Sequence, residues 1–301
     1  MENSNPKVTV IMRTRNSEDT IGEALKQLFA QDFKDFVLLV VDSESTDRTV
    51  EIVQGYPHEF LDIPPGDYYP GDVLNQSIRR SNSDIVVFVN SDVIALTNAS
   101  LRHLVAAFDD PEVQAAFGRQ APRPEAVSWV RRDYAVSYPE HGPAPAWQKL
   151  SLPFAALRKS AWEQHPFYTA AYSSEDTEWG NWALSQGYKI AYVPEALVMH
   201  SHNYTFKEIS ARRFVEGEAD AFIYGECFSL IDASRRYLAV SARDLVWYVK
   251  HMDFIGIPSI PVRRFIYQWA YYKGRKFGEL RIARGINDPS LSQKLVKRRI
   301  K

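Results

Sequence analysis

The first ninety residues alternate short apolar runs with segments of helical periodicity. The apolar runs fall at residues 8–12, 36–41 and 85–89. Segments with apolar residues every three or four positions fall at residues 17–31, 45–54 and 71–81. The last two runs are continuously apolar, which is typical of strands covered on both faces of a parallel sheet. The alternation predicts an α/β fold with a mostly parallel sheet flanked by helices.

The pattern changes twice further along the chain. Five prolines interrupt residues 119–150, which predicts loops and short helices there. A helical segment then follows at 177–186, with strand-like segments at 188–194 and 196–202. Beyond Tyr204 the sequence is mainly helical. We therefore expect a main domain over residues 1–204, built from parts at 7–95 and 112–204, and a helical region over 205–301.

Composition supports a folded protein without an obvious membrane span. The chain has 301 residues, of which 45% are apolar, enough to bury a large core. The N-terminus lacks the features of a signal peptide, and no apolar run approaches the roughly 18 to 20 residues of a spanning helix. One cysteine, Cys227, cannot form an internal disulfide. The expected location is the cytoplasm.

Charge is concentrated at the end of the chain. Residues 262–301 carry twelve basic and two acidic side chains, a net charge of +10 in a chain whose total is −1. Aromatic residues are interleaved with these charges, which suits the surface of an anionic membrane. Nucleic acid, or a helix packed on the main domain with a solvated basic face, are the alternatives.

Nucleotide binding through a glycine-rich loop is excluded. The only glycine before Gly55 is Gly22, inside a predicted helix, so neither a dinucleotide-binding turn nor a P-loop follows the first strand. Polar side chains at strand ends are the remaining candidates, and each alone is most often a turn former or helix cap. They are Thr14, Arg15 and Asn16 after the first strand, Asp42 after the second, and Asn90, Ser91 and Asp92 after the run at 85–89. Together they predict a site for a nucleoside diphosphate, in which Asp42 accepts hydrogen bonds from base or ribose and Asp92 offers an oxygen to Mg²⁺ or Mn²⁺.

Six motifs in order resemble those of family 2 glycosyltransferases. They are VTVIMRTRN (8–16), VVDSESTDRT (40–49), YPGDVLNQSI (69–78), VFVNSD (87–92), SSEDTEWG (173–180) and ALVMHSH (196–202). Within that family, FGRQAP (117–122) and HSHNYTF (200–206) are similar to a bacterial group of rhamnosyltransferases. The resemblance covers residues 7–220. It implies a GT-A fold, a nucleoside-diphosphate-sugar donor, a divalent metal and inversion at the anomeric carbon.

The resemblance assigns donor and metal roles to particular residues. Asp42 matches the contact to base and ribose, and Thr14 and Asn16 match nucleotide contacts, with Arg15 where many members have an aromatic residue. Asp92 matches the last position of the metal-binding DxD motif. Asn90 stands where the first aspartate is expected, so one carboxylate is missing. Residues 7–95 would then bind the donor, and residues 112–204 would form the acceptor and catalytic region.

The resemblance also implies a general base and a histidine ligand. Asp176 of the Glu175–Asp176 pair matches the base that removes the acceptor's hydroxyl proton. Glu175 and Trp179 lie one helical turn apart and are expected to hold the acceptor, with a core position as the alternative for Trp179. His200 matches the family's metal-ligating histidine best, and His202 is its substitute.

Arg119 and Gln120 complete the donor candidates. They follow a predicted strand, VQAAFG, and Arg119 is suited to a phosphate, with a surface ion pair as the alternative.

The resulting prediction is an inverting hexosyltransferase of surface polysaccharide synthesis. It would move rhamnose or another hexose to a glycan or lipid-linked glycan, with residues 262–301 contacting an anionic membrane and no nucleic acid as partner. The main alternative is a non-catalytic GT-A-like protein that binds a nucleotide sugar or glycan. A sugar-1-phosphate nucleotidyltransferase would need the missing glycine-rich loop, and a nucleic-acid-binding protein would use the basic tail.

Overall fold

The computed structural model describes residues 7–64, 66, 68–289 and 292–294. Two compact units make up the chain. The first comprises Met1–Pro124, Tyr134–Phe167 and Asp176–Ser201, and the second comprises Glu125–Asp133, Tyr168–Glu175 and His202–Lys301. Two short segments, Glu125–Asp133 and Tyr168–Glu175, thus group with the long C-terminal segment in the second unit.

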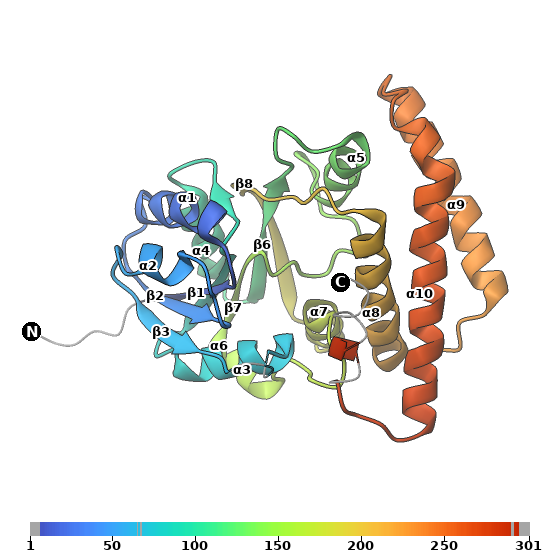
Figure 1. The fold of residues 1–301 in the computed structure, drawn as a ribbon. Coiled ribbons are helices and arrows are strands. Elements are labelled where there is room, and N and C mark those ends of the chain that lie inside the picture. Colours follow the sequence, from blue (N-terminus) through green and yellow to red (C-terminus); the bar gives the residue numbers. More distant parts are fainter. Residues whose placement is uncertain (1–6, 65, 67, 290–291, 295–301) are drawn as a thin grey trace, which may run out of the picture. The chain divides into compact units, whose positions relative to one another are not determined.

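The first unit is built on a mixed eight-stranded sheet (Figure 1). Its strands are β1 (Val8–Thr14), β2 (Phe36–Asp42), β3 (Glu59–Asp62), β4 (Ile85–Asn90), β5 (Ile94–Ala95), β6 (Val113–Ala121), β7 (Phe154–Arg158) and β8 (Lys189–Met199). Their order is β3-β2-β1-β4-β7-β6-β8-β5. The strands from β3 to β4 are parallel, and so are β6 and β8, whereas β7 runs antiparallel to both of its neighbours.

Helices cover both faces of this sheet. They are α1 (Glu18–Phe29), α2 (Thr49–Val53), α3 (Pro70–Arg80), α4 (Ser100–Ala106), α6 (Lys159–Gln164) and α7 (Glu175–Ser185), with a 3-10 turn η1 (Ala107–Asp109). Successive strand residues alternate between two cores: Val10 and Met12 pack with α1 and α4, while Ile11 packs with α3, α6 and α7. The predicted α/β architecture, its three N-terminal strands and their helices are therefore confirmed.

Two features of the sheet differ from the expectation. The strand-like segments at 188–194 and 196–202 form one strand, β8, because the chain continues through Pro194 with a register irregularity. The strands β3, β5 and β7 were not predicted, and β5 has only two residues. β3 is short and mostly exposed, and β7 has five residues and follows the proline-rich segment, so neither shows a clear periodic pattern.

The irregularity between β6 and β8 depends on Gly118. Gly118 pairs with Val193, but the next residue, Arg119, pairs with Leu197. A Cβ atom at position 118 would overlap the carbonyl oxygen of Ala196 and the ring of Phe154. Only glycine lets the two backbones approach so closely, and the resulting bulge sets which residues face each other at the ends of both strands.

The second unit is helical. It contains α8 (Phe206–Tyr224), α9 (Leu230–Lys250), a 3-10 turn η2 (Ile257–Ser259) and α10 (Ile260–Ala283), while α5 (Ser128–Ser137) begins in this unit and ends in the first. α8 and α9 each open on a complete capping box, with Thr205 and Ser229 as the N-caps. Gly274 lets α10 lie directly on the backbone of α8 at Phe214.

Buried arginines stabilise this unit through ion pairs. Asp244 of α9 is fully buried and accepts hydrogen bonds from Arg263 and Arg264 of α10. Arg132 Nη2 lies 2.9 Å from Asp244 Oδ1, and Asp133 accepts from Arg264 over 3.2 Å. Because each guanidinium has a carboxylate partner, the charges are tolerated away from water.

The basic tail is therefore much less basic at its surface than its sequence indicates. Arg281 is 1% exposed and pairs with Glu218 of α8. Arg275 is 3% exposed and donates to the carbonyls of Asp220 and Glu226. With Arg263 and Arg264, four of the twelve basic residues thus act inside the unit and are not available to an anionic partner. Four others, Lys297, Arg298, Arg299 and Lys301, lie outside the described residues.

Large apolar side chains lie exposed on α9 and on the start of α10. On α9, Leu238, Leu245 and Val249 recur at helical spacing and are 65%, 45% and 52% exposed. Phe265 and Trp269 of α10 are also exposed. Within the described chain, no helix is both long and apolar enough to cross a membrane.

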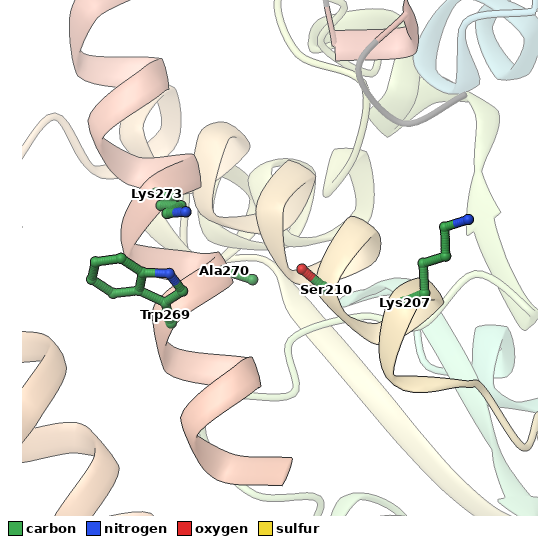
Figure 2. Close-up of a pocket in the computed structure, with 5 residues that line it drawn as sticks. All are labelled: Lys207, Ser210, Trp269, Ala270 and Lys273. Carbon is green, nitrogen blue, oxygen red and sulfur yellow. The ribbon is translucent and has the colours of Figure 1, made fainter. Parts of the chain in front are cut away.

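A shallow hollow of about 290 Å³ lies between α8 and α10 (Figure 2). It is lined by Lys207 and Ser210 from α8 and by Trp269, Ala270 and Lys273 from α10. The Lys273 ammonium lies 4.9 Å from the centre of the Trp269 ring, so cation and indole are adjacent. The hollow thus has the Lys273 ammonium and the Ser210 hydroxyl beside an aromatic surface, while the Lys207 side chain extends away from Trp269 (Figure 2).

We expect Gly118→Ala to lower the free energy of unfolding by about 1–3 kcal/mol, because the new methyl group meets backbone atoms that cannot move aside. Gly22→Ala is the matched control. Its Cβ would lie 3.7 Å from Ile52, an ordinary contact, and alanine is the better helix former by up to about 1 kcal/mol. Urea unfolding of both variants checks the difference. Equal stabilities would contradict the role assigned to Gly118.

Candidate functional site

Three parallel strands end side by side at the edge of the sheet where the polar candidates lie. Thr14 at the end of β1 is in register with Asp42 at the end of β2. Arg13 of β1 is in register with Asn90 at the end of β4. The predicted convergence of residues from three strand ends is therefore present, at the place where open α/β sheets bind ligands.

Hydrogen bonds connect the loops after β1 and β2. Asn16 adopts a left-handed backbone conformation with φ of 46°, and its side-chain oxygen accepts from the Thr46 N–H over 2.8 Å. The Asn16 N–H donates to Ser45 Oγ, and Ser45 donates through its N–H and its hydroxyl to the Asp42 carboxylate at 2.9 and 2.6 Å. Asp42 is thereby held as a buried acceptor at the base of the two loops.

The remaining strand-end candidates differ in accessibility. Arg15 is exposed, whereas Thr14 is buried and its carbonyl accepts from the Ser43 N–H. Ser91 is buried and its hydroxyl lies 2.9 Å from that of Ser17 at the start of α1. Asn90 accepts from Arg13 over 3.4 Å. Arg15 is thus the most solvent-exposed of these side chains, whereas Asp42 and Ser91 are buried at the ends of their strands.

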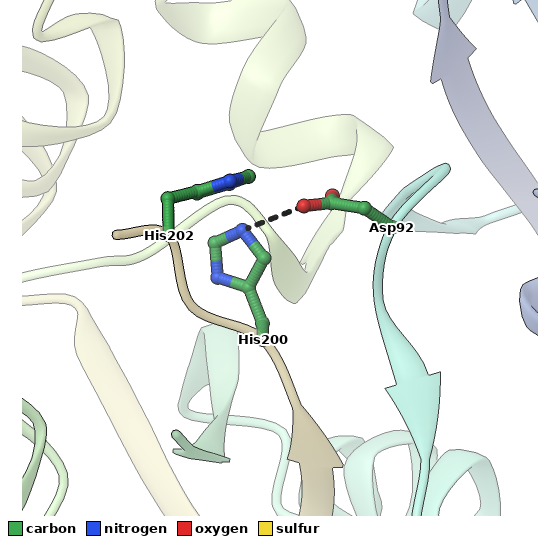
Figure 3. Close-up of side chains that lie close together, drawn as sticks. All are labelled: Asp92, His200 and His202. Atoms are coloured by element: carbon green, nitrogen blue, oxygen red, sulfur yellow. Dashed lines mark ion pairs between the residues drawn. The ribbon is translucent and has the colours of Figure 1, made fainter. Parts of the chain in front are cut away.

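Asp92 and His200 face each other across two strand ends (Figure 3). Asp92 follows β4 and His200 follows β8, and the distance from His200 Nε2 to Asp92 Oδ2 is 3.5 Å. Both side chains are largely shielded from solvent. The chain places His202 two residues beyond His200, where it opens a segment of the second unit.

A chain of polar groups continues behind His200. Its Nδ1 lies 2.8 Å from Gln120 Oε1, and Gln120 Nε2 donates to Ser151 Oγ over 2.9 Å. Ser151 is in turn 2.7 Å from the Tyr138 hydroxyl. Gln120 is 2% exposed, so both ends of its amide are used inside the unit. This burial and these hydrogen bonds favour a role for Gln120 beside His200 over the expected direct contact with the donor.

Asp176 lies in the first turn of α7, within the first unit. Its Oδ1 accepts from the Thr177 N–H over 2.8 Å. Burial raises the pKa of Tyr138 above its ordinary value, and the nearby Asp176 carboxylate adds to the increase. Asp176 is therefore close to the same polar chain that begins at His200. Its neighbour Glu175 begins α7 and groups with the second unit.

Trp179 belongs to the core. It is fully buried, its indole N–H donates to the His165 carbonyl over 2.9 Å, and its ring packs near Phe167 and Trp182. This burial favours the core alternative for Trp179 over the expected contact with the acceptor. The residue instead anchors the helix that carries Asp176.

Arg119 forms the ion pair that was the alternative to phosphate binding. Its Nη2 lies 3.2 Å from Glu140 Oε2, and the arginine is about one-quarter exposed. Neighbouring residues on a strand point to opposite faces of the sheet, so the side chains of Arg119 and Gln120 do not meet the same partners.

Two residues at this edge, Arg123 and Arg13, were not predicted, because their roles depend on partners distant in sequence. Arg123 donates to the backbone carbonyl of Asp92 over 2.7 Å, and its own N–H donates to Ser201 Oγ. It thus ties the loop after β4 to the end of β8. Arg13, which directly precedes the candidates Thr14 to Asn16, donates to the side chain of Asn90. In the sequence, Arg123 is marked only by its position between two prolines, Pro122 and Pro124.

Comparison with known proteins identifies the family. The model of the family described as glycosyl transferase family 2 matches residues 9–174. The O-antigen chain rhamnosyltransferase RfbN of Salmonella typhimurium is 30% identical over 226 residues, which are 70% of this chain and 71% of that protein. The O-antigen chain rhamnosyltransferase WbaN of Salmonella anatum is 31% identical over 194 residues, 60% and 61% of the two chains.

Solved structures agree with the fold. A mannosyltransferase from Pyrobaculum calidifontis, in complex with GDP-Man and Mn²⁺, superposes with a TM-score of 0.61 at 20% identity, over 92% of this chain and 88% of that one. Glucosyl-3-phosphoglycerate synthase from Mycobacterium tuberculosis, with Mn²⁺, UDP-glucose and phosphoglyceric acid, gives 0.55 at 23% identity, over 74% and 81%. The chain has the GT-A fold and belongs to glycosyl transferase family 2.

Proposed function

We propose that this glycosyltransferase moves a hexose or deoxyhexose, such as rhamnose, from a nucleoside diphosphate to a glycan or lipid-linked glycan of a surface polysaccharide, with inversion at the anomeric carbon. The observation that carries the proposal is the meeting of β1, β2 and β4 at one sheet edge, beside Asp92 and His200. The rhamnosyltransferase names of two relatives support the choice of sugar and acceptor class.

The donor's nucleoside would lie over the loops after β1 and β2. Asp42 is held as an acceptor for base or ribose, and Asn16 shapes the loop beside it. Arg15 is exposed at this edge and suits the phosphates, with Asn90 and Ser91 on the neighbouring strand end. Thr14 contributes mainly through the backbone. Two structural neighbours are described with GDP-Man and UDP-glucose, which supports a nucleotide-sugar donor.

Asp92 and His200 would hold a divalent cation, Mg²⁺ or Mn²⁺. Two ligands of one octahedral ion with bonds of about 2.1 Å lie about 3 Å apart, close to the 3.5 Å between Asp92 Oδ2 and His200 Nε2. A carboxylate oxygen with an imidazole nitrogen is a donor set that fits such an ion. When bound, the ion stabilises the charge of the departing diphosphate. His202 stays an alternative ligand from its place in the sequence, and Asn90 offers a neutral oxygen where a second carboxylate is expected.

Asp176 would act as the general base. Its carboxylate takes the proton of the acceptor hydroxyl as that oxygen forms a bond to the anomeric carbon. The bond from that carbon to the diphosphate oxygen breaks on the opposite side, which inverts the configuration. Glu175, adjacent in sequence, would hold the acceptor. Thr177 and the anchoring of α7 by Trp179 keep Asp176 in place.

Asn90 favours one competing function, a GT-A-like protein that binds a nucleotide sugar without catalysis. The neutral amide removes one of the charges that an ion at this edge would meet. Metal-dependent hydrolysis of the donor in the absence of acceptor would exclude this alternative.

We further propose that the second unit contacts the inner face of a cell membrane. The exposed apolar side chains of α9 are accompanied by four exposed basic residues, Arg235, Arg236, Arg243 and Lys250. Within 262–301, Phe265, Trp269 and Lys273 are also exposed, and the hollow beside Lys273 suits a lipid phosphate. A second copy bound to the same face of α9 would bring like charges together, so an anionic lipid surface is favoured.

Asp176→Asn should reduce transfer by about 10²- to 10⁴-fold, because the amide cannot accept the hydroxyl proton. Donor binding, measured by the thermal stabilisation that the nucleotide sugar gives, should be unchanged. Asp84→Asn, an exposed acid at the opposite end of β4, is the control and should keep full activity. Full transfer by the Asp176 variant would refute the assignment of the base.

A panel of nucleotide sugars should contain one that stabilises the protein only, or mainly, with Mn²⁺. At a concentration 100 times its Kd, a donor adds about 2.7 kcal/mol to the free energy of unfolding. Asp92→Asn should lose the Mn²⁺ dependence, whereas Asp84→Asn should retain it. Thermal unfolding measures both effects, and a panel without any stabilising donor would count against nucleotide-sugar binding.

Replacing Leu238, Leu245 and Val249 together by Glu should lower binding to vesicles with 30% anionic lipid by about tenfold or more, since buried apolar surface contributes about 25 cal/mol per Å². A double variant, Phe60→Glu with Leu184→Glu, changes exposed apolar residues of the first unit and is the control. Sedimentation with vesicles measures binding. A dimer in light scattering that the triple variant dissociates, without vesicle binding, would instead assign the face to a second copy.

A further inference from the structure

Gln120 stands directly behind the proposed metal ligand His200. The pairing of β6 with β8 places Gln120 opposite Val198, and the His200 N–H donates to the Ala121 carbonyl over 3.0 Å. Gln120 itself is buried, so its polar amide needs hydrogen-bond partners inside the protein to be stable at this position. His200 and Ser151 are these partners.

The two ring nitrogens of His200 have partners at different distances. Nδ1 lies 2.8 Å from Gln120 Oε1, a normal hydrogen-bond length, and 3.3 Å from the Tyr134 hydroxyl, a longer contact. Nε2 lies 3.5 Å from Asp92 Oδ2, too long for a good N–H···O hydrogen bond. The proton of a neutral imidazole is therefore better placed on Nδ1, where Gln120 accepts it.

We propose that Gln120 is a positioning residue that holds His200 in the tautomer with its proton on Nδ1, so that the Nε2 lone pair faces Asp92. The inference rests on the proposed metal site for its consequence, because a histidine ligand must present an unprotonated nitrogen to the ion. Partners that fix the second ring nitrogen typically change metal affinity by 10- to 100-fold.

Ser151 and Tyr138 continue the hydrogen bonds of the Gln120 amide away from His200. With Oε1 toward His200, the Nε2 group donates to Ser151 Oγ, which lies 2.7 Å from the Tyr138 hydroxyl. The reversed amide would present an N–H to Nδ1 and move the imidazole proton to Nε2. That proton would then point at Asp92 across 3.5 Å, a distance that favours the first arrangement.

The tautomer can be observed without metal, donor or activity. In the ¹⁵N-labelled protein at a pH where His200 is neutral, long-range ¹H–¹⁵N spectra should show its proton on Nδ1. Gln120→Met, which keeps the shape and removes the acceptor, should shift the population toward the proton on Nε2. A His200 signal with the proton on Nε2 in the unmodified protein would overturn the proposal.

Calorimetric titration with Mn²⁺ alone tests the consequence. Gln120→Met should weaken binding by about 10- to 100-fold, and Gln120→Glu, which retains an acceptor oxygen, should restore most of it. Gln31→Met is the matched control, because Gln31 is also a buried, hydrogen-bonded glutamine of the first unit. Equal Mn²⁺ affinity in the Gln120→Met and Gln31→Met variants would refute the positioning role. If the tautomer is as expected but the unmodified protein binds no Mn²⁺, the proposed metal site fails and the tautomer assignment stands.

Discussion

The close approach of β6 and β8 at Gly118 is the constraint on which the site depends. It shifts the pairing by three residues on β8 and thereby decides that Gln120 lies opposite Val198 and that His200 follows the same edge. Asp92 comes from another strand, and Arg123 holds its loop against Ser201 at the end of β8. Backbone geometry at a glycine with no chemistry of its own thus determines which side chains can act together.

The antiparallel strand β7 joins the two parallel parts of the sheet and also lies beside a series of hydrogen-bonded side chains. It lies between β4, whose end leads to Asp92, and β6, which carries Gln120. Ser151, just before β7, links Gln120 to Tyr138. The strands on the two sides of β7 are connected through the sheet, and Gln120, Ser151 and Tyr138 add hydrogen bonds between side chains beside β7.

Sequence alone predicted the fold well where burial produces a strong pattern. The continuous runs at 36–41 and 85–89 can only be strands covered on both sides, and the polar residues after them had to meet at one edge. Side-chain direction was much harder to predict. Trp179 and Gln120 sit in matching motifs, yet both point into the protein, and the partners that take them there, His165 and Ser151, are 14 and 31 residues away. The buried arginines of α10 were missed for the same reason, since Asp244 and Asp133 lie far from them in sequence.

The buried ion pairs of the helical unit also determine how it responds to salt. Mobile ions screen exposed charges over a Debye length of about 8 Å at physiological ionic strength, but they reach interior pairs such as Asp244 with Arg263 much less. High salt would therefore weaken attraction between the exposed lysines and an anionic surface while leaving the helices assembled. The arginines inside this unit and the cations outside it belong to the same short stretch of sequence, yet ionic strength acts on the two groups separately.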